Sequence, residues 1–262
     1  MPVSFGFHDV VHKAQLALRE SGHRTVYTLP REVFREHLAA IRSRAAAHAV
    51  GRVDQVGQNE QRAVFLTFDD GRVSAFSCVA PELERLGWRG HFFVITSLIG
   101  RPGYLEHGHI RELHRRGHLI GSHSCSHPEQ MSSLSWAKLL WEWRESCYLL
   151  SEIVGAPITV ASVAGGYYSH KVGQSAAASG IKVLFTSEPT VSEKVVDGCR
   201  VLGRYWVRRS TPPAIVGAIA GGNKWPRWQH AAWWLVNKAA KRLTGQWYIP
   251  LRRVLLDNIS RR

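Results

Sequence analysis

Two short clusters of carboxylate and imidazole side chains have the residue types and spacing that chemistry at a metal ion requires. Asp69 and Asp70 directly follow the apolar run AVFLTF, and His123 and His127 follow the shorter run HLIG. Neighbouring residues at a strand end point to opposite sides, so one carboxylate can bind a cation while the other faces water. The two imidazoles, four residues apart, meet on one face if the backbone makes a helical turn. One Asp and two His form a ligand set for zinc that leaves open positions for water and substrate.

Each cluster also has a purely structural interpretation. Asp70-Gly71 is a common turn signal, and a chain with 14 histidines contains chance pairs at the surface. Both clusters, however, directly follow predicted strands, and the carboxyl ends of parallel strands are where α/β folds place their active sites. We therefore favour one joint site over two unrelated turns.

The elements that must position these residues alternate along the chain. Short apolar strands are expected at 3–7, 63–68, 91–95, 118–121, 160–163 and 183–186, and helices at 29–47, 77–86, 107–116, 134–154 and 171–179. Alternating strands and helices predict an α/β fold with a parallel sheet. Because the strands are apolar throughout, we expect both faces of that sheet to be covered.

With these motifs in place, the chain resembles the polysaccharide deacetylase (NodB homology) family, the fourth carbohydrate-esterase family. TFDDG at Thr67–Gly71 is similar to the first family motif, and HSCSH at His123–His127 to the second, H-[S/T]-x-x-H. The resemblance extends roughly from Val3 to Arg209. It implies a distorted (β/α)7-type barrel.

The resemblance also implies an activity and a role for each motif residue. The activity is hydrolysis of the acetamide of an N-acetylated amino sugar or glycan. Asp69 is the expected general base, and Asp70, His123 and His127 are the expected ligands of a divalent metal, most often Zn²⁺.

The third family motif, similar to R-x-P-x-G, is altered in this chain. Ser162-Val163-Ala164-Gly165-Gly166 stands in its place, with Ser162 at the position of the arginine that orients the base. Gly165 is the expected donor of a backbone N–H to the oxyanion. The alternative for this glycine pair is a simple flexible turn.

The general acid and the substrate contacts come from elsewhere in the chain. The late L-x-H motif of much of the family is absent, but a circularly permuted branch, which includes poly-N-acetylglucosamine deacetylases, takes its histidine from an N-terminal strand. His8 in the run GFHDV is therefore the expected general acid, with a structural histidine as the alternative. Glu188 and Tyr167 are the candidates for substrate binding.

The positive charge is concentrated in the last quarter of the chain. The net charge is +14, and thirteen basic residues with a single acid between Arg200 and Arg262 account for +12 of it. We expect residues 1–210 to form the catalytic barrel and residues 211–262 a basic, Trp-rich helical extension. A stripe from Trp228 to Leu243 predicts an amphipathic helix suited to a membrane interface. The alternatives are a helix packed on the barrel with its basic side in water, or a solvated tail.

Localisation follows from the cysteines and the N-terminal residues. The 4 cysteines include no CxxC pair, which is typical of a reducing compartment. The first residues lack the charged start and apolar core of a secretory signal, and no run reaches the ~20 apolar residues that span a bilayer. We expect a cytoplasmic protein that lies peripherally at the inner membrane.

The leading functional hypothesis is N-deacetylation of an amino sugar in polysaccharide or surface-glycan biosynthesis. One alternative is another metal-dependent amide hydrolase. A second is a catalytically impaired sugar-binding or membrane-associated module on the same fold, which Ser162 and the missing late histidine keep open. Nucleic-acid binding by the basic extension is the weakest of these hypotheses.

Overall fold

The computed structural model describes residues 1–13, 26–45, 50–55 and 63–228. These residues group into two compact units: Met1–His8 with Ala46–Trp206, and Asp9–Ala45 with Val207–Arg262. Of the helix expected from Trp228 to Leu243, only the first residue is among them, so that prediction lies outside the described residues. The division of the chain at residue 210 into barrel and extension likewise stays a prediction.

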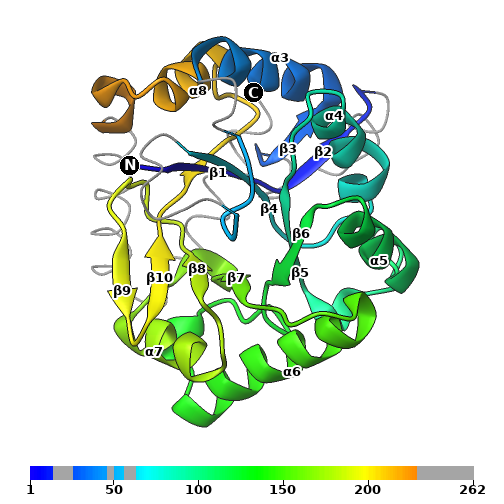
Figure 1. Cartoon of the computed structure of the whole chain (residues 1–262), viewed down its shortest axis with the longest axis vertical. Coiled ribbons are helices and arrows are strands. Elements are labelled where there is room, and N and C mark those ends of the chain that lie inside the picture. The colour runs from blue at the N-terminus through cyan, green and yellow to red at the C-terminus, as the bar shows by residue number, and fades with distance from the viewer. Residues whose placement is uncertain (14–25, 46–49, 56–62, 229–262) are drawn as a thin grey trace. The chain divides into compact units, whose positions relative to one another are not determined.

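The first unit is built on one nine-stranded sheet (Figure 1). Its strands are, in chain order, β1 (Val3–Phe7), β4 (Val64–Phe68), β5 (His91–Val94), β6 (Leu119–Ser122), β7 (Val160–Ser162), β8 (Val183–Phe185), β9 (Lys194–Val196), β10 (Cys199–Leu202) and β11 (Tyr205–Trp206). Their order across the sheet is β11-β1-β4-β5-β6-β7-β8-β10-β9. All pairs are parallel except β9 with β10. The parallel strands therefore end at one edge, where the polar motifs begin.

The predicted α/β fold with a largely parallel sheet is confirmed. All five residues of β4 are buried, because both faces of the sheet are covered. One face carries a cluster that includes Phe65, Phe93 and Phe185. The opposite face packs on the helices through a second cluster centred on Trp143.

The helices of this unit follow the strands, as the alternating pattern predicts. They are the π-helical turn η1 (Ala75–Val79), α4 (Ala80–Glu84), η2 (Thr96–Leu98), α5 (His107–Arg115), η3 (Met131–Ser133), α6 (Trp136–Val154), η4 (Ala164–Gly166) and α7 (His170–Ala178). In α6, the Ser135 side chain accepts from the backbone N–H of Lys138, and Gly155 ends the helix at φ 70°. When η1 and α4 are taken as one continuous helix over 75–84, the helix boundaries of this unit lie within two residues of the predicted ones. The 3-10 turns were not predicted.

The connection between β10 and β11 links the two sides of the sheet. β10 lies beside β8, whereas β11 lies beside β1. Only Gly203 and Arg204 separate them in the chain. A side chain at Gly203 would overlap the carbonyl oxygen of Glu188, so this close passage requires glycine. Neither β10 nor β11 was predicted from the sequence.

The second unit contains two short strands and two helices. They are β2 (Asp9–Val11), β3 (Thr28–Pro30), α3 (Arg31–Arg44) and α8 (Pro213–Ala220). The strands pair in parallel, and α8 packs closely on α3, where Gly217 lies against the carbonyl of Ala40. His37 of α3 also contacts the carbonyl oxygen of Thr211 at 2.9 Å. Residues just after 210 therefore belong to the packing of this unit.

Within the described part of the chain, no helix is both long and apolar enough to span a bilayer.

Candidate metal and hydrolytic site

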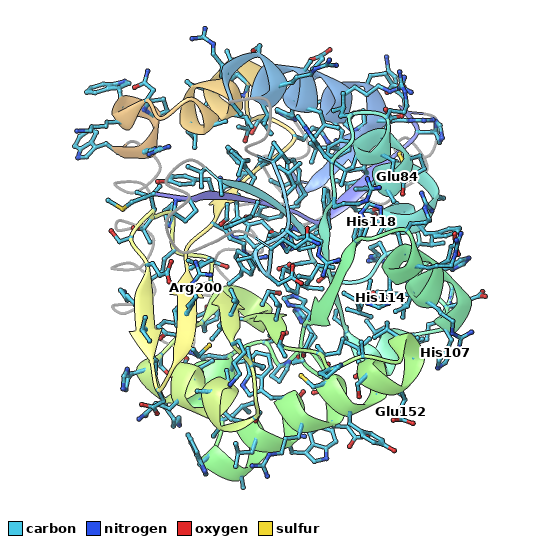
Figure 2. All side chains as sticks on the ribbon, viewed as in Figure 1. Glu84, His107, His114, His118, Glu152 and Arg200 are labelled. Atoms are coloured by element: carbon cyan, nitrogen blue, oxygen red, sulfur yellow. The ribbon has the colours of Figure 1, made fainter. Side chains whose placement is uncertain are left out.

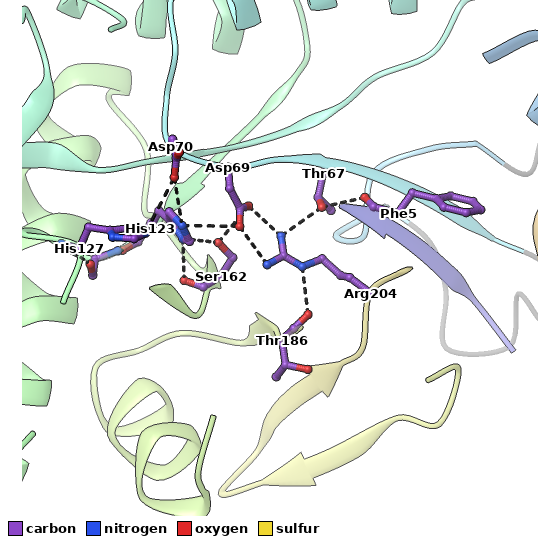
Figure 3. A network of polar contacts seen from close by, with 11 residues as sticks. Phe5, Thr67, Asp69, Asp70, His123, His127, Ser162, Thr186 and Arg204 are labelled. Carbon is purple, nitrogen blue, oxygen red and sulfur yellow. Dashed lines mark hydrogen bonds and ion pairs between the residues drawn. The ribbon is translucent and has the colours of Figure 1, made fainter. Parts of the chain in front are cut away.

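The aspartate pair and the histidine pair meet at one edge of the sheet, as the sequence predicts (Figure 3). Asp69 and Asp70 directly follow β4. The hydrogen-bonded ladder between β4 and its parallel partner β1 continues for one more bond, in which the Asp69 N–H donates to the Phe7 carbonyl at 3.0 Å. His123 directly follows β6, and its N–H donates to the carbonyl of Val94 in β5 at 2.9 Å. The parallel ladder therefore places the two motifs side by side.

Three residues of these motifs have a left-handed backbone. Asp70, Ser124 and His127 have φ values of 74°, 63° and 54°. This conformation is unfavourable for residues with a side chain and is found preferentially at functional sites. The Ser124 hydroxyl accepts from the His127 N–H at 3.0 Å, which stabilises the tight turn between the two imidazoles. The backbone of the site is therefore bent in order to direct the side chains.

Asp70, His123 and His127 present three ligand atoms within 4.8 Å of one another. Their separations from Asp70 Oδ1 are 3.6 Å for His123 Nε2 and 3.9 Å for His127 Nε2. A tetrahedral ion with bonds of about 2.1 Å separates its ligands by roughly 3.4 Å, so the three residues fit a zinc-sized cation. His127 is 33% exposed and Asp70 18%, whereas His123 is 2% exposed. The site therefore opens to solvent on the side of His127.

Among the described residues, one group of His, Cys, Asp and Glu side chains has this geometry. Other histidines lie apart from it: His107 and His114 belong to α5 (Figure 2). His118 is buried and contacts Glu84 at 2.8 Å. The joint-site interpretation of the two motifs therefore agrees with the geometry.

Ser162 fixes the orientation of the His123 ring. Nδ1 of His123 lies 3.1 Å from the Ser162 carbonyl oxygen and 2.6 Å from its hydroxyl, and that hydroxyl donates to Asp69 Oδ1 at 3.2 Å. When Nδ1 carries the proton, Nε2 keeps its lone pair and is directed to the metal position. The serine at the altered third motif thus joins an expected metal ligand to the expected base.

Glu142 of α6 holds the loop that carries the two histidines. Its carboxylate accepts from the backbone N–H groups of Cys125 and Ser126 at 3.0 and 2.8 Å and from the Ser126 hydroxyl at 2.6 Å. Glu142 is fully buried, and Lys138 lies 3.4 Å from it. A buried carboxylate that pairs with two backbone donors fixes the course of the loop. This contact was not predicted from the sequence.

Arg204, which follows β10, holds Asp69 by both carboxylate oxygens (Figure 3). Nη1 donates to Oδ1 at 2.7 Å and Nη2 to Oδ2 at 3.0 Å. Nη1 also donates to the hydroxyl of Thr67 at 3.2 Å, and Nε to the carbonyl of Thr186 at 3.0 Å. The guanidinium is fully buried and its planar fork matches the carboxylate.

The charge of Arg204 decides the protonation state of Asp69. Burial raises the pKa of the Asp69 carboxyl, but the positive charge of Arg204 and the Arg204 hydrogen bonds outweigh that effect and lower it to about 2. Asp69 is therefore ionised at neutral pH, which a general base requires.

Arg204 was not predicted from the sequence, because the family resemblance places the base-orienting arginine in the third motif. Ser162 does occupy that motif position, and the guanidinium reaches Asp69 from the β10–β11 connection instead. The available signal was an arginine one residue beyond the apolar pair Val201–Leu202, after Gly203. With β10 recognised as a strand, this arginine falls at the same edge as the other polar motifs.

His8 lies at the end of β1, beside the aspartate pair. Phe7 and Phe68 are register partners, so His8 follows its strand as Asp69 follows β4. Burial lowers the pKa of His8, while the charges of Asp70 and Asp69 act in the opposite direction. The imidazole stacks on Trp206, with ring centroids 4.5 Å apart. This placement is compatible with the predicted acid, whose role stays a prediction.

The other predicted residues lie on loops after β7 and β8. Gly165 has φ 66°, and a side chain there would overlap the carbonyl of Glu129, so the turn requires glycine. Tyr167 is half-buried directly after this turn. The side chain of Glu188 pairs with Lys194 at 3.3 Å. Their parts in catalysis and substrate binding stay predictions.

Comparison with known proteins identifies the family. Residues 56–184 match the family described as "Polysaccharide deacetylase". The chain therefore carries a polysaccharide deacetylase domain. Its resemblance to this family, first indicated by TFDDG and HSCSH, is thereby confirmed.

Known proteins match this chain at low sequence identity, and two solved structures among them share its fold. The protein YxkH of Bacillus subtilis (strain 168) is 25% identical over 134 residues, 51% of this chain and 48% of that one. Streptococcus pyogenes deacetylase PplD, solved with acetate, has 17% identity and a TM-score of 0.66 over 80% of this chain and 94% of its own. IcaB from Ammonifex degensii has 21% identity and a TM-score of 0.62 over 84% and 97%. The chain spans about half the length of YxkH.

Proposed function

We propose that this deacetylase-family chain is a divalent-metal-dependent N-deacetylase that hydrolyses the acetamide of an N-acetylated amino sugar. The observation that carries the proposal is that three side chains able to bind one metal ion lie beside an ionised, buried carboxylate. Asp70, His123 and His127 supply the cluster, and Asp69, held by Arg204, is the carboxylate beside it. A bound divalent cation supplies Lewis-acid polarisation of the acetyl carbonyl and a lowered pKa for water, and Zn²⁺ fits the donor set.

In this proposal the residues of the chain move two protons. Asp69 accepts a proton from water as the water oxygen bonds to the acetyl carbon. His8 donates a proton to the sugar nitrogen as the carbon–nitrogen bond breaks, which gives acetate and a free amine. Gly165 is proposed to donate its backbone N–H to the oxyanion, and Glu188 and Tyr167 to contact the sugar. Arg204 argues against the impaired-module alternative, because the base keeps an arginine partner despite Ser162.

The direct test is acetate release from N-acetylglucosamine oligomers by the full chain loaded with Zn²⁺. Asp69→Asn removes the base but leaves all three ligands, so we expect zinc to stay bound while kcat falls by about 10²–10⁴-fold. Asp70→Asn serves as the converse variant, with weakened zinc binding. Equal acetate release by wild type and Asp69→Asn would refute the proposed mechanism.

We further propose that the substrate belongs to polysaccharide or surface-glycan synthesis and is met at the inner face of a membrane. Cys78, Cys125, Cys147 and Cys199 are all free thiols, which suits a reducing compartment. Trp225 and Trp228 are stacked with centroids 5.7 Å apart and are 65% and 61% exposed. Lys224 directly precedes Trp225, and Arg227 directly precedes Trp228. Tryptophan beside basic residues is typical of contacts with anionic lipid headgroups.

The membrane contact is tested with vesicles of phosphatidylcholine with and without phosphatidylglycerol. We expect co-sedimentation of the full chain with the anionic vesicles only. The double variant Trp225→Ala/Trp228→Ala should reduce it, and deletion of 229–262, which leaves α8 on α3, should reduce it further. Trp136→Ala, an exposed tryptophan on α6, is the control. Unchanged sedimentation of the deletion variant would exclude the proposed contact.

A further inference from the structure

We infer that Trp206 is a positioning residue that connects the acid side of the site to the base side. Its indole stacks on the His8 imidazole, with centroids 4.5 Å apart and planes at 27°. The same ring lies 4.6 Å from Cζ of Arg204, the residue that holds Asp69. The inference rests on the proposed function for the roles of His8 and Asp69.

Strand pairing explains how one indole reaches both residues. Trp206 in β11 is the register partner of Gly6 in β1, so their side-chain positions face the same side of the sheet. His8 lies two residues after Gly6, and Arg204 two residues before Trp206. A two-residue step along an extended chain returns to the same side. All of these positions therefore project toward one region.

Gly6 creates the space that the indole fills. An added Cβ at Gly6 would lie 2.8 Å from Cε3 of Trp206, a separation that real side chains do not adopt. The ring therefore lies over the bare backbone of β1 and extends to His8. A larger residue at position 6 would move the indole away from both of its partners.

The ring gives Arg204 a favourable surface, and it does the same for His8 when the imidazole carries a proton to donate. The face of an indole attracts a guanidinium and an imidazolium through its π electrons. A fixed flat surface also limits the rotation of the His8 side chain about its own bonds. Arg204 is fully buried and donates hydrogen bonds to Asp69, Thr67 and Thr186. The indole therefore packs against a group that is held in place. Arg204, which holds Asp69, therefore also holds the indole of Trp206, and the indole in turn holds the imidazole of His8.

A rival role for Trp206 is direct stacking on the sugar, because its side chain is half-buried at the edge of the site. The two roles predict different kinetics. A positioning residue changes kcat, since only the proton donor is displaced, whereas a sugar platform changes KM. The variants Trp206→Leu and Trp206→Phe separate them, because Leu removes the aromatic face and Phe keeps one.

We expect Trp206→Leu to lose about 10²-fold in kcat, since a displacement of about 1 Å in a reacting group costs this much, with KM and zinc affinity within about threefold of wild type. Trp206→Phe should recover most of the loss. The control is Trp141→Leu, which removes another cation–π partner, with Lys138 3.5 Å from its ring, on the exposed side of α6. A rise in KM alone, or equal losses for Leu and Phe, would overturn the inference.

A second measurement does not depend on turnover. The imidazole resonances of His8, assigned with His8→Asn in the full chain, should carry a ring-current shift from the stacked indole. We expect that shift to vanish in Trp206→Leu and to persist in part in Trp206→Phe. Unmoved resonances in Trp206→Leu would overturn the inference. Absence of acetate release by wild type with the shift present would refute the proposed function alone.

Discussion

Arg204 and Asp69 form a bidentate ion pair although 135 positions separate them in the chain. The pair depends on the β10–β11 connection, which carries Arg204 across the end of the sheet to the carboxyl end of β4. Burial of the two charges is tolerable because they pair with each other, because Thr67 and Thr186 accept from Arg204, and because the Ser162 hydroxyl donates to Asp69. The pair keeps the expected base ionised and fixes its direction.

Removal of the Arg204 charge should raise the pKa of Asp69. Burial raises that pKa, and the Arg204 charge is the largest effect that lowers it, so in Arg204→Met the carboxyl should protonate well above pH 2. The acid limb of the kcat/KM profile should then move to higher pH. We also expect a loss of about 3–5 kcal/mol in the free energy of unfolding, because the carboxylate is left buried and unpaired.

Arg200→Met is the matched control for that variant. Arg200 makes a similar two-point contact with Glu193, at 2.6 and 3.0 Å, but in a solvent-exposed pair. Such pairs contribute about 0–1 kcal/mol, so the control should unfold close to wild type and keep its pH profile. An unchanged acid limb in Arg204→Met would contradict the role of Arg204.

Glu142→Gln should weaken zinc binding without touching a ligand. The amide replaces one carboxylate oxygen by a donor, so the contacts to Cys125, Ser126 and Lys138 cannot all be kept. We expect a loss of about 10–100-fold in zinc affinity, measured by competition with a chelating dye. Glu145→Gln, on the exposed side of α6, should bind zinc as wild type does. Equal affinities for both variants would show that the loop does not depend on Glu142.

His91 should make the metal-free protein sensitive to acid. Its Nδ1 donates to the Leu66 carbonyl at 3.0 Å, its Nε2 accepts from the Val53 N–H at 2.9 Å, and burial lowers its pKa from 6.5 to about 4. The unfolded chain therefore binds a proton at a higher pH than the folded chain. The stability contributed by neutral His91 is present above about pH 6.5 and is lost as the pH falls toward 4.

The loss attributable to His91 should reach roughly 2 kcal/mol by about pH 5. It is measured by urea unfolding in the presence of a chelator at about pH 7 and about pH 5, in wild type and His91→Gln. Glutamine can keep both hydrogen bonds but does not titrate, so its stability should fall less with acid. Parallel pH dependences of the two proteins would contradict the account.

The parallel strands of the barrel and the four residues of its two main motifs could be predicted from the sequence. Strands such as VFLTF are short, wholly apolar and followed by turn residues, so local pattern alone defines them. The three ligand candidates and Asp69 lie at the ends of such strands. Their proximity then follows from the parallel arrangement.

Arg204 and Glu142 could not be predicted in the same way. β10 is the short run CRVL, with a charged residue inside it, and β11 has two residues, too few to show a period. Glu142 lies on an amphipathic helix, where a charged residue predicts a solvent-facing position. Its burial depends on unpaired backbone donors of a distant loop, and only the tertiary fold brings them to it.

The most direct test of the central claim is anomalous X-ray diffraction at the zinc edge from crystals of the full chain grown with Zn²⁺. The account predicts a peak about 2.0–2.2 Å from an oxygen of Asp70 and from Nε2 of both His123 and His127, with Asp69 outside bonding distance. Zinc bound elsewhere, or a peak that includes Asp69 in place of one of these three ligands, would contradict it.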